Sequence, residues 1–430
     1  MGLLPCPPAC HSNEDSDTPQ SLSSTTHLHS DSSLSSQPSL PSVPSLTSQK
    51  SQPLDPSQPL STTRHRLIST LKGHSSAVFS LALAGKHIYS GSSDSEIRSW
   101  SRDPSTPNPD NKTVIPSSHG AVKSIVVSGD TLFTAHQDHK IRVWKIDNPT
   151  KYYPCVNTLP TVRDRFARFF WAKDYVEVRR HKKRTWVHHV DAVSALALSR
   201  DGSLLYSASW DRTFKVWRTS DFKCLESSWN AHDDAINAVV VSPVDGSVYT
   251  GSADKRIKVW KRHEGEKKHR LVDTLEKHKS AVNALALSTD GSVLYSGACD
   301  RSIIVWEKDG CSTCGGGGGQ GDVDGRHMSV VGALRGHKKA ILCLVAVADL
   351  VCSGSADKTV RIWRRGSERD YSCLAVLEGH RGPVKCLAAA VDTCSGTDGN
   401  SGSGTSYNIY SGSLDFDIKV WQVWVPFVSS

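Results

Sequence analysis

The chain has 430 residues, of which 37% are hydrophobic and 22% are charged, and its formal net charge is +8. No stretch approaches the ~20 consecutive apolar residues that a membrane-spanning helix needs. The first residues, MGLLPCPPAC, lack the basic region and the apolar run of a secretory signal peptide. Twelve cysteines are too few for a disulfide scaffold, so we expect free thiols in a reducing compartment.

Residues 1–63 differ in composition from the rest of the chain. They contain 17 serines and 10 of the 20 prolines but no Phe, Trp or Tyr, and their net charge is −4. Such a segment cannot bury enough apolar surface to offset the entropy that ordering costs. We therefore predict a disordered Ser/Pro-rich tail over 1–63 and a folded body with a net charge of +12 over 64–430.

One pattern recurs seven times after the tail. In each copy a hydroxyl residue stands four residues before an Asp, the Asp stands six residues before a Trp, and a His lies upstream. An apolar run such as AVSALAL follows each His and indicates a buried strand, so each copy predicts four short strands. The seven sets are His74, Ser90, Asp94, Trp100; His119, Thr134, Asp138, Trp144; His189, Ser207, Asp211, Trp217; His232, Thr250, Asp254, Trp260; His278, Ser296, Asp300, Trp306; His337, Ser353, Asp357, Trp363; and His380, Ser411, Asp415, Trp421.

The spacing of these tryptophans indicates a propeller. Successive tryptophans are 44, 73, 43, 46, 57 and 58 residues apart. The shortest spacings match the ~40–45 residues of one four-stranded blade, and the longer ones indicate insertions. The strand expected over 66–71 has no blade of its own. It should complete the last blade as its outer strand, because that pairing removes an open sheet edge.

The repeat resembles the WD40 family over residues 64–430, although the residue after each Trp is never Asp. The resemblance implies an all-β fold, a seven-bladed WD40 β-propeller. Within each blade the buried indole N–H needs an acceptor, which the Ser or Thr oxygen supplies, and the hydroxyl, His and Asp continue the network. Ser, His and Asp also form hydrolytic triads, but catalysis needs one such set. Seven sets therefore predict a structural role for these residues. We expect no enzyme activity, no cofactor and no metal.

A closer resemblance covers residues 179–242 and 247–260, which are similar to plant WD40 proteins of the Jingubang group. It implies a non-enzymatic scaffold or regulator in signalling or transcriptional regulation, located in cytoplasm and nucleus. We expect a monomer that binds protein partners and does not associate with membranes.

WD40 resemblance also implies that a partner binds at the narrow face around the central pore. The positions expected there are the residue after the first strand's Val or Ile and the residue before each turn Asp. Arg212, Lys255, Arg301 and Lys358 follow the turn Asp and add positive charge, which favours an acidic or phosphorylated peptide. Trp210 is either an interface anchor or a residue packed under a neighbouring loop. The predicted contact residues are Phe79, Lys123, Gln137, Trp210, Arg212, Asn237, Asn283, Leu342 and Lys385.

The largest insertion is expected over 147–185 and is basic and aromatic. Phe166, Phe169, Phe170 and Tyr175 share helical spacings with Val162, which favours one amphipathic helix. A basic patch follows, and it is read either as a nucleic-acid, phosphate or nuclear-import site or as the solvated edge of a packed insert. Nucleic-acid binding through residues 161–186 is the alternative function. The patch consists of Arg179, Arg180, Lys182, Lys183 and Arg184.

Two further insertions, 309–327 and 392–408, are rich in Gly and Ser and predict flexible loops. The first contains Cys311 and Cys314 at the spacing of half a zinc site. No second Cys or His pair stands at a matching distance, so the sequence does not support a four-ligand metal centre.

Overall fold

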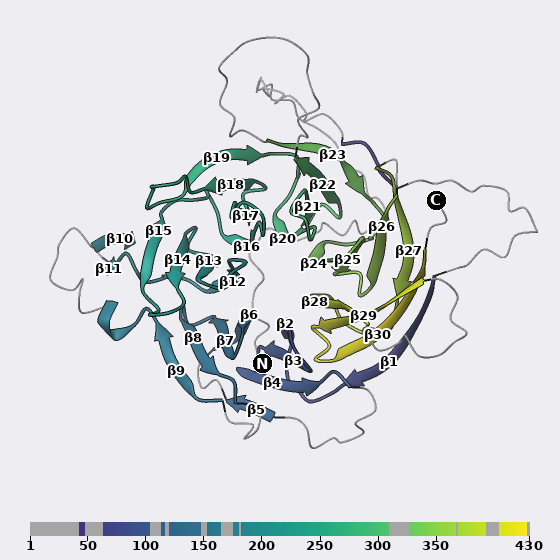
Figure 1. Cartoon of the computed structure of the whole chain (residues 1–430), viewed down its shortest axis with the longest axis horizontal. Helices are drawn as coiled ribbons and strands as arrows, with labels where there is room; N and C mark the ends of the chain where they lie inside the picture. Colours follow the sequence, from purple (N-terminus) through teal and green to yellow (C-terminus); the bar gives the residue numbers. More distant parts are fainter. Residues whose placement is uncertain are drawn as a thin grey trace, which may run out of the picture.

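The seven repeats fold into seven four-stranded antiparallel sheets arranged around one axis, as the computed structural model shows (Figure 1). The structure describes residues 43–47, 63–103, 113–116, 120–147, 153–164, 175–179, 182–308, 327–366, 369–392 and 404–427. Within them no helix is long and apolar enough to cross a membrane. The predicted seven-bladed β-propeller is confirmed.

The first four sheets, blades 1 to 4, follow one another along the chain. Each is ordered from its innermost to its outermost strand. Their strands are β2 (Val78–Ala84), β3 (His87–Ser92), β4 (Glu96–Ser101) and β5 (Thr113–Pro116); β6 (Val122–Ser128), β7 (Thr131–His136), β8 (Ile141–Lys145) and β9 (Cys155–Leu159); β12 (Val193–Leu198), β13 (Leu204–Ser209), β14 (Phe214–Arg218) and β15 (Cys224–Ser228); and β16 (Ile236–Val241), β17 (Val248–Ser252), β18 (Ile257–Lys261) and β19 (Arg270–Leu275).

The last three sheets, blades 5 to 7, complete the ring. Their strands are β20 (Val282–Leu287), β21 (Val293–Ala298), β22 (Ile303–Lys308) and β23 (Met328–Leu334); β24 (Ile341–Val347), β25 (Leu350–Ser355), β26 (Val360–Arg365) and β27 (Tyr371–Leu377); and β28 (Val384–Val391), β29 (Gly404–Ser413), β30 (Ile418–Pro426) and β1 (Arg64–Leu71). The outer strand of blade 7 is thus the first strand of the chain, which pairs with β30 from Arg64 opposite Trp424 to Leu71 opposite Ile418. The predicted ring closure is confirmed, and Figure 1 shows β1 lying along β30.

The core lies between the blades rather than within them. Among the described residues, seven apolar clusters each combine side chains of two neighbouring blades. Blade 1 contributes Tyr89 to the cluster that holds Leu132 and Trp144 of blade 2, for example. A sheet that is apolar on both faces has to be covered on both, and a closed ring achieves this for every sheet.

A hydrogen bond across each junction also joins the innermost strands. Ser80 and Ser124 accept backbone N–H groups of the next blade, and Ser194 donates to the carbonyl of Ile236. Asn237 and Asn283 donate in the same way to Val282 and Ile341. At the last two junctions the thiols of Cys343 and Cys386 point at the carbonyls of Val384 and Val78. The chain therefore forms one closed circle of contacts.

Two expected insertions are smaller in the structure than the sequence predicts. Residues 155–159 of the expected insert 147–185 form β9, which pairs with β8 and completes blade 2. In the expected loop 392–408, residues 404–408 extend β29, because residues 422–426 of β30 offer them a partner strand. Residues 309–326 lie outside the described residues, and so do Cys311 and Cys314.

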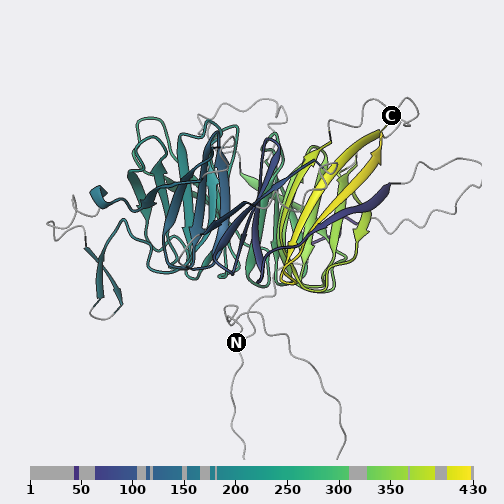
Figure 2. The ribbon, with the colours of Figure 1, turned by 90° about the horizontal axis from the view of Figure 1, so that it is seen from below.

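The rest of the first insert contains a hairpin, so Tyr175 does not belong to the predicted helix. Residues 162–164 are helical, and β10 (Tyr175–Arg179) pairs with β11 (Lys182–Thr185). Tyr175 is thus in a strand, because hairpin pairing overrides the helical spacing of its aromatic residues. Phe166, Phe169 and Phe170 lie outside the described residues. Figures 1 and 2 place the hairpin outside the ring of blades.

The expectation of an unstructured tail does not hold for residues 43–47. This segment lies against the outer strands of blades 5 and 6, with bridges between Ser45 and Ala333 and between Thr47 and Tyr371. Residues 1–42 and 48–62 lie outside the described residues.

Candidate partner-binding surface

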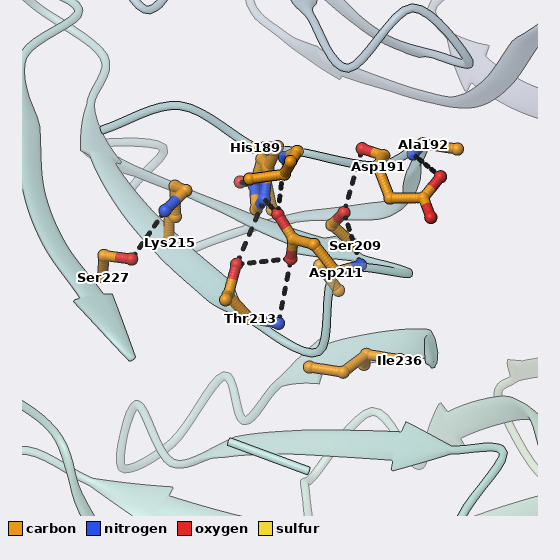
Figure 3. A network of polar contacts seen from close by, with 12 residues as sticks. His189, Asp191, Ala192, Ser209, Asp211, Thr213, Lys215, Ser227 and Ile236 are labelled. Atoms are coloured by element: carbon orange, nitrogen blue, oxygen red, sulfur yellow. Dashed lines mark hydrogen bonds and ion pairs between the residues drawn. The ribbon is translucent and has the colours of Figure 1, made fainter. Parts of the chain in front are cut away.

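The repeated polar residues form the predicted network. In blade 3 the Trp217 indole donates to Ser207 Oγ at 2.9 Å, and His189 Nε2 lies 2.8 Å from the same oxygen. His189 Nδ1 lies 3.0 Å from an oxygen of Asp211 (Figure 3). Equivalent contacts connect all four members in blades 1, 4, 5, 6 and 7. Their side chains are bonded to one another within the blade, so they serve architecture.

Blade 2 departs from this arrangement. Trp144 still donates to Thr134 Oγ1 at 2.9 Å, but the imidazole that contacts Thr134 is His136, with Nε2 at 2.7 Å. His119, the histidine expected from the sequence, lies outside the described residues. Asp138 forms an ion pair with Arg142 at 2.6 Å. The sequence spacing gave no reason to consider His136, because it stands within the strand instead of upstream of it.

The network controls the charge of the turn aspartates. Burial alone raises the pKa of Asp94 and Asp254, but hydrogen bonds from the blade histidines and from backbone amides outweigh burial and lower it. The same balance lowers the pKa of Asp300, Asp357 and Asp415. A carboxylate with a lowered pKa adds stability above about pH 4, and this stability is lost as the pH falls below that value.

The seven aspartates define one face of the ring, which we call the turn face. In every blade the residue after the turn Asp has a left-handed backbone, with φ between 65° and 74°. This conformation is uncommon for residues other than Gly, Asn and Asp, yet here the residues are Ser95, His139, Arg212, Lys255, Arg301, Lys358 and Phe416. The rigid turn holds four exposed cations and the 45% exposed Phe416 at equivalent places on consecutive blades.

The residues expected near the axis share a second backbone feature. Each innermost strand has an irregular register at the residue after its first Val or Ile. Such bulges redirect a side chain and recur next to binding sites. The half-buried side chains at these positions are Phe79, Lys123, Ser194, Asn237, Asn283, Leu342 and Lys385.

Three of the predicted contact residues meet in space. The Lys123 ammonium lies 4.1 Å from the Phe79 ring centroid and 5.4 Å from that of Trp210, so one cation bridges aromatic residues of blades 1 and 3. Trp210 is half-buried and also packs against the alanines Ala235, Ala253 and Ala281. Trp210 is therefore packed against neighbouring residues over part of its surface, as one of the two alternatives predicts. The cation–π contacts hold the Lys123 side chain in place.

Other predicted residues already have partners or stand apart. The amides of Asn237 and Asn283 donate across blade junctions, as described above. Gln137 donates its backbone N–H to Ala121, the same hydrogen bond that Trp210 makes to Ala192. Leu342 and Lys385 lie on blades 6 and 7, outside the cluster of Phe79, Lys123 and Trp210, although blade 7 is the neighbour of blade 1.

The strongest charge on the turn face lies over blades 5, 6 and 7. The residue after the blade histidine donates its N–H to the turn Asp, which holds Lys279, Lys338 and Arg381 at this face. Sequence reasoning missed these cations, although their place directly after each histidine is a visible signal. We call the following set the basic sector. Its exposed members are Lys279, Arg301, Lys338, Lys339, Lys358 and Arg381, and its half-buried member is Lys385.

Acidic residues are arranged differently around the face. Within the two residues after the blade histidine, where blades 5 to 7 carry Lys or Arg, blades 3 and 4 carry the exposed Asp191, Asp233 and Asp234. In the loops of the basic sector, Glu276 is paired with Arg256 of blade 4 at 2.6 Å, and Glu378 is exposed. The turn face is therefore divided into a basic sector and a mixed sector.

Besides the turn face, the described residues contain a group of potential metal ligands and a pocket. His74, Asp94 and Glu96 bring potential metal ligands within 4.8 Å of one another, the one such group in the described part of the chain. Both nitrogens of His74 already make hydrogen bonds within the blade 1 network. On the opposite face, a pocket of about 520 Å³ between blades 3 and 4 is lined by residues that include Arg200, Arg262 and Asp245.

The basic patch of the first insert is only partly described. Arg179, Lys182, Lys183 and Arg184 belong to the hairpin strands β10 and β11. Arg180 lies outside the described residues, and the structure describes no side chain of this patch. Its predicted role stays a prediction.

The segments that match a known protein family correspond to individual blades of the structure. The family described as WD domain, G-beta repeat, matches residues 65–101, 180–218, 222–261, 269–307, 328–364 and 371–422. These matches cover more than half of the chain. They leave out blade 2, the blade whose polar network differs from the others.

Individual relatives match short segments. A pre-mRNA-processing factor 19 homolog 2 of Arabidopsis thaliana is 38% identical over 60 residues, which is 14% of this chain and 11% of that protein. Cell division control protein 4 of Candida albicans is 31% identical over 103 residues, 24% of this chain and 13% of that protein. A probable cytosolic iron-sulfur protein assembly protein 1 of Neurospora crassa is 50% identical over 36 residues, 8% of each chain.

The chain thus spans only about a tenth of the length of these relatives, and they differ in function. The family match over most blades, the seven sheets and the indole-centred networks agree: this protein is a member of the WD-repeat family.

Proposed function

We propose that this protein is a non-enzymatic scaffold that binds an acidic or phosphorylated segment of a partner protein at the turn face, over blades 5 to 7. The observation that carries the proposal is the basic sector, in which three consecutive blades present exposed cations from equivalent positions. WD-repeat propellers generally act as protein-interaction scaffolds, and the repeated Ser, His and Asp groups serve architecture.

The chemistry of the sector favours this class of ligand. Arg and Lys form charge-assisted hydrogen bonds with carboxylates and phosphates. Several cations on rigid turns raise the local concentration of an anionic segment and speed its association. Leu342 lies beside the sector on blade 6, and the 45% exposed Phe416 follows the turn Asp of blade 7. These two residues offer apolar contacts to a segment that contains hydrophobic residues next to its acids.

The location and pathway are proposed on the resemblance of residues 179–242 and 247–260 to the Jingubang group. On that basis the protein acts in signalling or transcriptional regulation in cytoplasm and nucleus, and we further propose that it is a monomer.

The test compares peptide capture by the full chain and by a charge-reversal variant. A tryptic digest of a cell extract, containing phosphorylated and unmodified peptides, is passed over the immobilised protein. The wild-type chain should enrich acidic and phosphorylated peptides. The triple variant Arg301→Glu/Lys358→Glu/Lys385→Glu should recover at least tenfold less, because its basic sector has reversed charge.

A matched control keeps the same change in net charge on the other face. Lys86, Lys223 and Lys268 are exposed in loops that lie opposite the turn face, so Lys86→Glu/Lys223→Glu/Lys268→Glu should bind like wild type. Equal losses in both variants would show that net charge, not the turn face, governs binding. Retention of RNA that depends on the insert 161–186, without any peptide enrichment, would favour the alternative of nucleic-acid binding.

A further inference from the structure

A short piece of the tail occupies a sheet edge that would otherwise be open. The outer strand of a propeller blade has one row of backbone groups without a partner strand. Residues 43–47, Val-Pro-Ser-Leu-Thr, lie along this row at the end of β23 in blade 5 and continue to the start of β27 in blade 6. Figure 1 shows this segment as a short purple piece beside the green strands β23 and β27, which lie far from it in the sequence.

The backbone of the segment makes directed hydrogen bonds. The Ala333 N–H donates to Pro44 O at 2.8 Å, and the Leu46 N–H donates to Ala333 O at 2.9 Å. The Tyr371 N–H donates to Leu46 O at 3.1 Å, which ties the segment to the second blade. This is the pattern by which an extended peptide adds to an exposed sheet edge.

The two aliphatic side chains give the contact selectivity. Leu46 packs against the apolar cluster between blades 5 and 6, and Val43 packs against the cluster between blades 4 and 5. A Cβ atom placed on Gly332 would lie 2.5 Å from Leu46 Cγ, so this glycine leaves the space that the leucine fills. Arg335 donates to Val43 O at 3.1 Å.

The remaining side chains of the segment point elsewhere. Ser45 is exposed, and its hydroxyl lies 2.8 Å from that of Thr47. Pro44 lacks an N–H and is fixed near an extended conformation, which lowers the entropy lost on docking. The recognised pattern is therefore an aliphatic residue, Pro, any residue, and Leu.

We propose that the edge formed by β23 and β27 is a peptide-docking site for an extended aliphatic-Pro-x-Leu segment, and that residues 43–47 are its intramolecular ligand. About 16 residues connect Thr47 to β1. A connection of this length gives an attached ligand an effective concentration on the order of millimolar. A modest intrinsic affinity is thus enough to keep the site filled, and release of the tail opens the edge to another chain.

The test uses the full chain and reads the exchange of individual backbone amides with deuterated water. Leu46→Asp places a charge where the apolar cluster receives the leucine, so it should release the segment. Exchange should then become at least tenfold faster at Ala333 and Tyr371, whose N–H groups donate to the segment. Ser45→Asp adds the same charge on the exposed side of the same segment and should exchange like wild type.

Addition of the peptide in trans completes the test. A synthetic peptide of residues 40–50 should restore slow exchange to the Leu46→Asp chain, and the same peptide with Asp at position 46 should not. A fluorescent form should bind the Leu46→Asp chain at least tenfold more tightly than wild type, where the tail competes. Adding Gly332→Val, or the milder exposed change Arg335→Ala, should weaken that binding.

Three results would overturn the proposal. The first is unchanged exchange at Ala333 and Tyr371 in Leu46→Asp. The second is equal peptide binding by wild type and Leu46→Asp. The third is peptide binding that neither Gly332→Val nor Arg335→Ala reduces.

Discussion

At the scale of single residues, the same hydrogen-bonding requirement is met by two different histidines. A buried indole N–H and a buried hydroxyl both need partners. Six blades supply the imidazole from the loop before the first strand, whereas blade 2 supplies His136 from β7 itself. Asp138 then pairs with Arg142. The contacts from indole to hydroxyl to imidazole are kept in blade 2, whereas the imidazole faces the carbonyl of Gly120 instead of the turn Asp.

The buried His136 makes the stability of blade 2 depend on pH. Burial and, secondly, the nearby Arg142 lower the pKa of His136 to about 3. Between about pH 6.5 and that value, the unfolded chain binds a proton at His136 that the folded chain does not, so the protein loses stability as the pH falls. We expect a contribution of ~1.4 kcal/mol per pH unit to the slope of the unfolding free energy. Burial also lowers the pKa of His189, with the same sign.

Urea unfolding between pH 4.5 and 7.5 checks this prediction. His136→Gln should flatten the dependence by about one proton, ~1.4 kcal/mol per pH unit. Identical slopes for wild type and His136→Gln would contradict the assigned role of His136.

At the scale of elements, bulges and turns decide which side chains are presented. The innermost strands alternate between two buried faces, and a regular strand would send every second residue into a neighbouring blade. One irregular residue in each strand breaks this alternation and places Phe79, Lys123 or Lys385 near the turn face. The left-handed backbone conformation after each turn Asp similarly fixes the Cα positions of Arg301 and Lys358.

The outer strand of blade 7 carries a prediction at this scale. β1 is the only described partner of the outer edge of β30. Deletion of residues 64–72 should therefore leave an exposed strand edge and cause self-association, measured as high-molecular-mass species by size-exclusion chromatography with light scattering. A nine-residue deletion within 309–326, where the sequence predicts a flexible loop, removes none of the described strands and should remain monodisperse. A monodisperse protein after deletion of 64–72 would be inconsistent with ring closure by β1.

At the scale of the whole molecule, the ring behaves as one unit because every junction is bonded. Side-chain hydrogen bonds join neighbouring innermost strands around the full circle of described blades. An open repeat array loses repeats from its ends, whereas this closed arrangement has no end. Breaking one junction should therefore weaken the entire propeller.

Asn283→Ala tests this property. The substitution leaves the carbonyl of Ile341 without its 2.9 Å partner, which should lower the free energy of unfolding by ~1–3 kcal/mol. Tryptophan fluorescence and far-ultraviolet circular dichroism should still report coincident transitions, because the blades unfold together. Two separated transitions would show that the blades are independent, and an unchanged midpoint would show that the junction contributes nothing.

Much of the fold follows from local patterns that recur. The hydroxyl-Asp-Trp spacing, the apolar runs and the extra strand before the first His identify seven blades and their closure, because each pattern reflects a requirement within one blade. The same patterns place the turn cations Arg212, Lys255, Arg301 and Lys358 on one face. The composition of residues 1–63 likewise predicts that they form no core of their own.

Other features depend on contacts between segments that are distant in the chain. No local spacing shows that His136 reaches Thr134, that Lys123 lies between Phe79 and Trp210, or that Asn237 and Asn283 are used at blade junctions. Nor does composition show that residues 43–47 find a sheet edge nearly 300 residues away. Local sequence sets which groups need partners, and only the closed ring decides which partners come within reach.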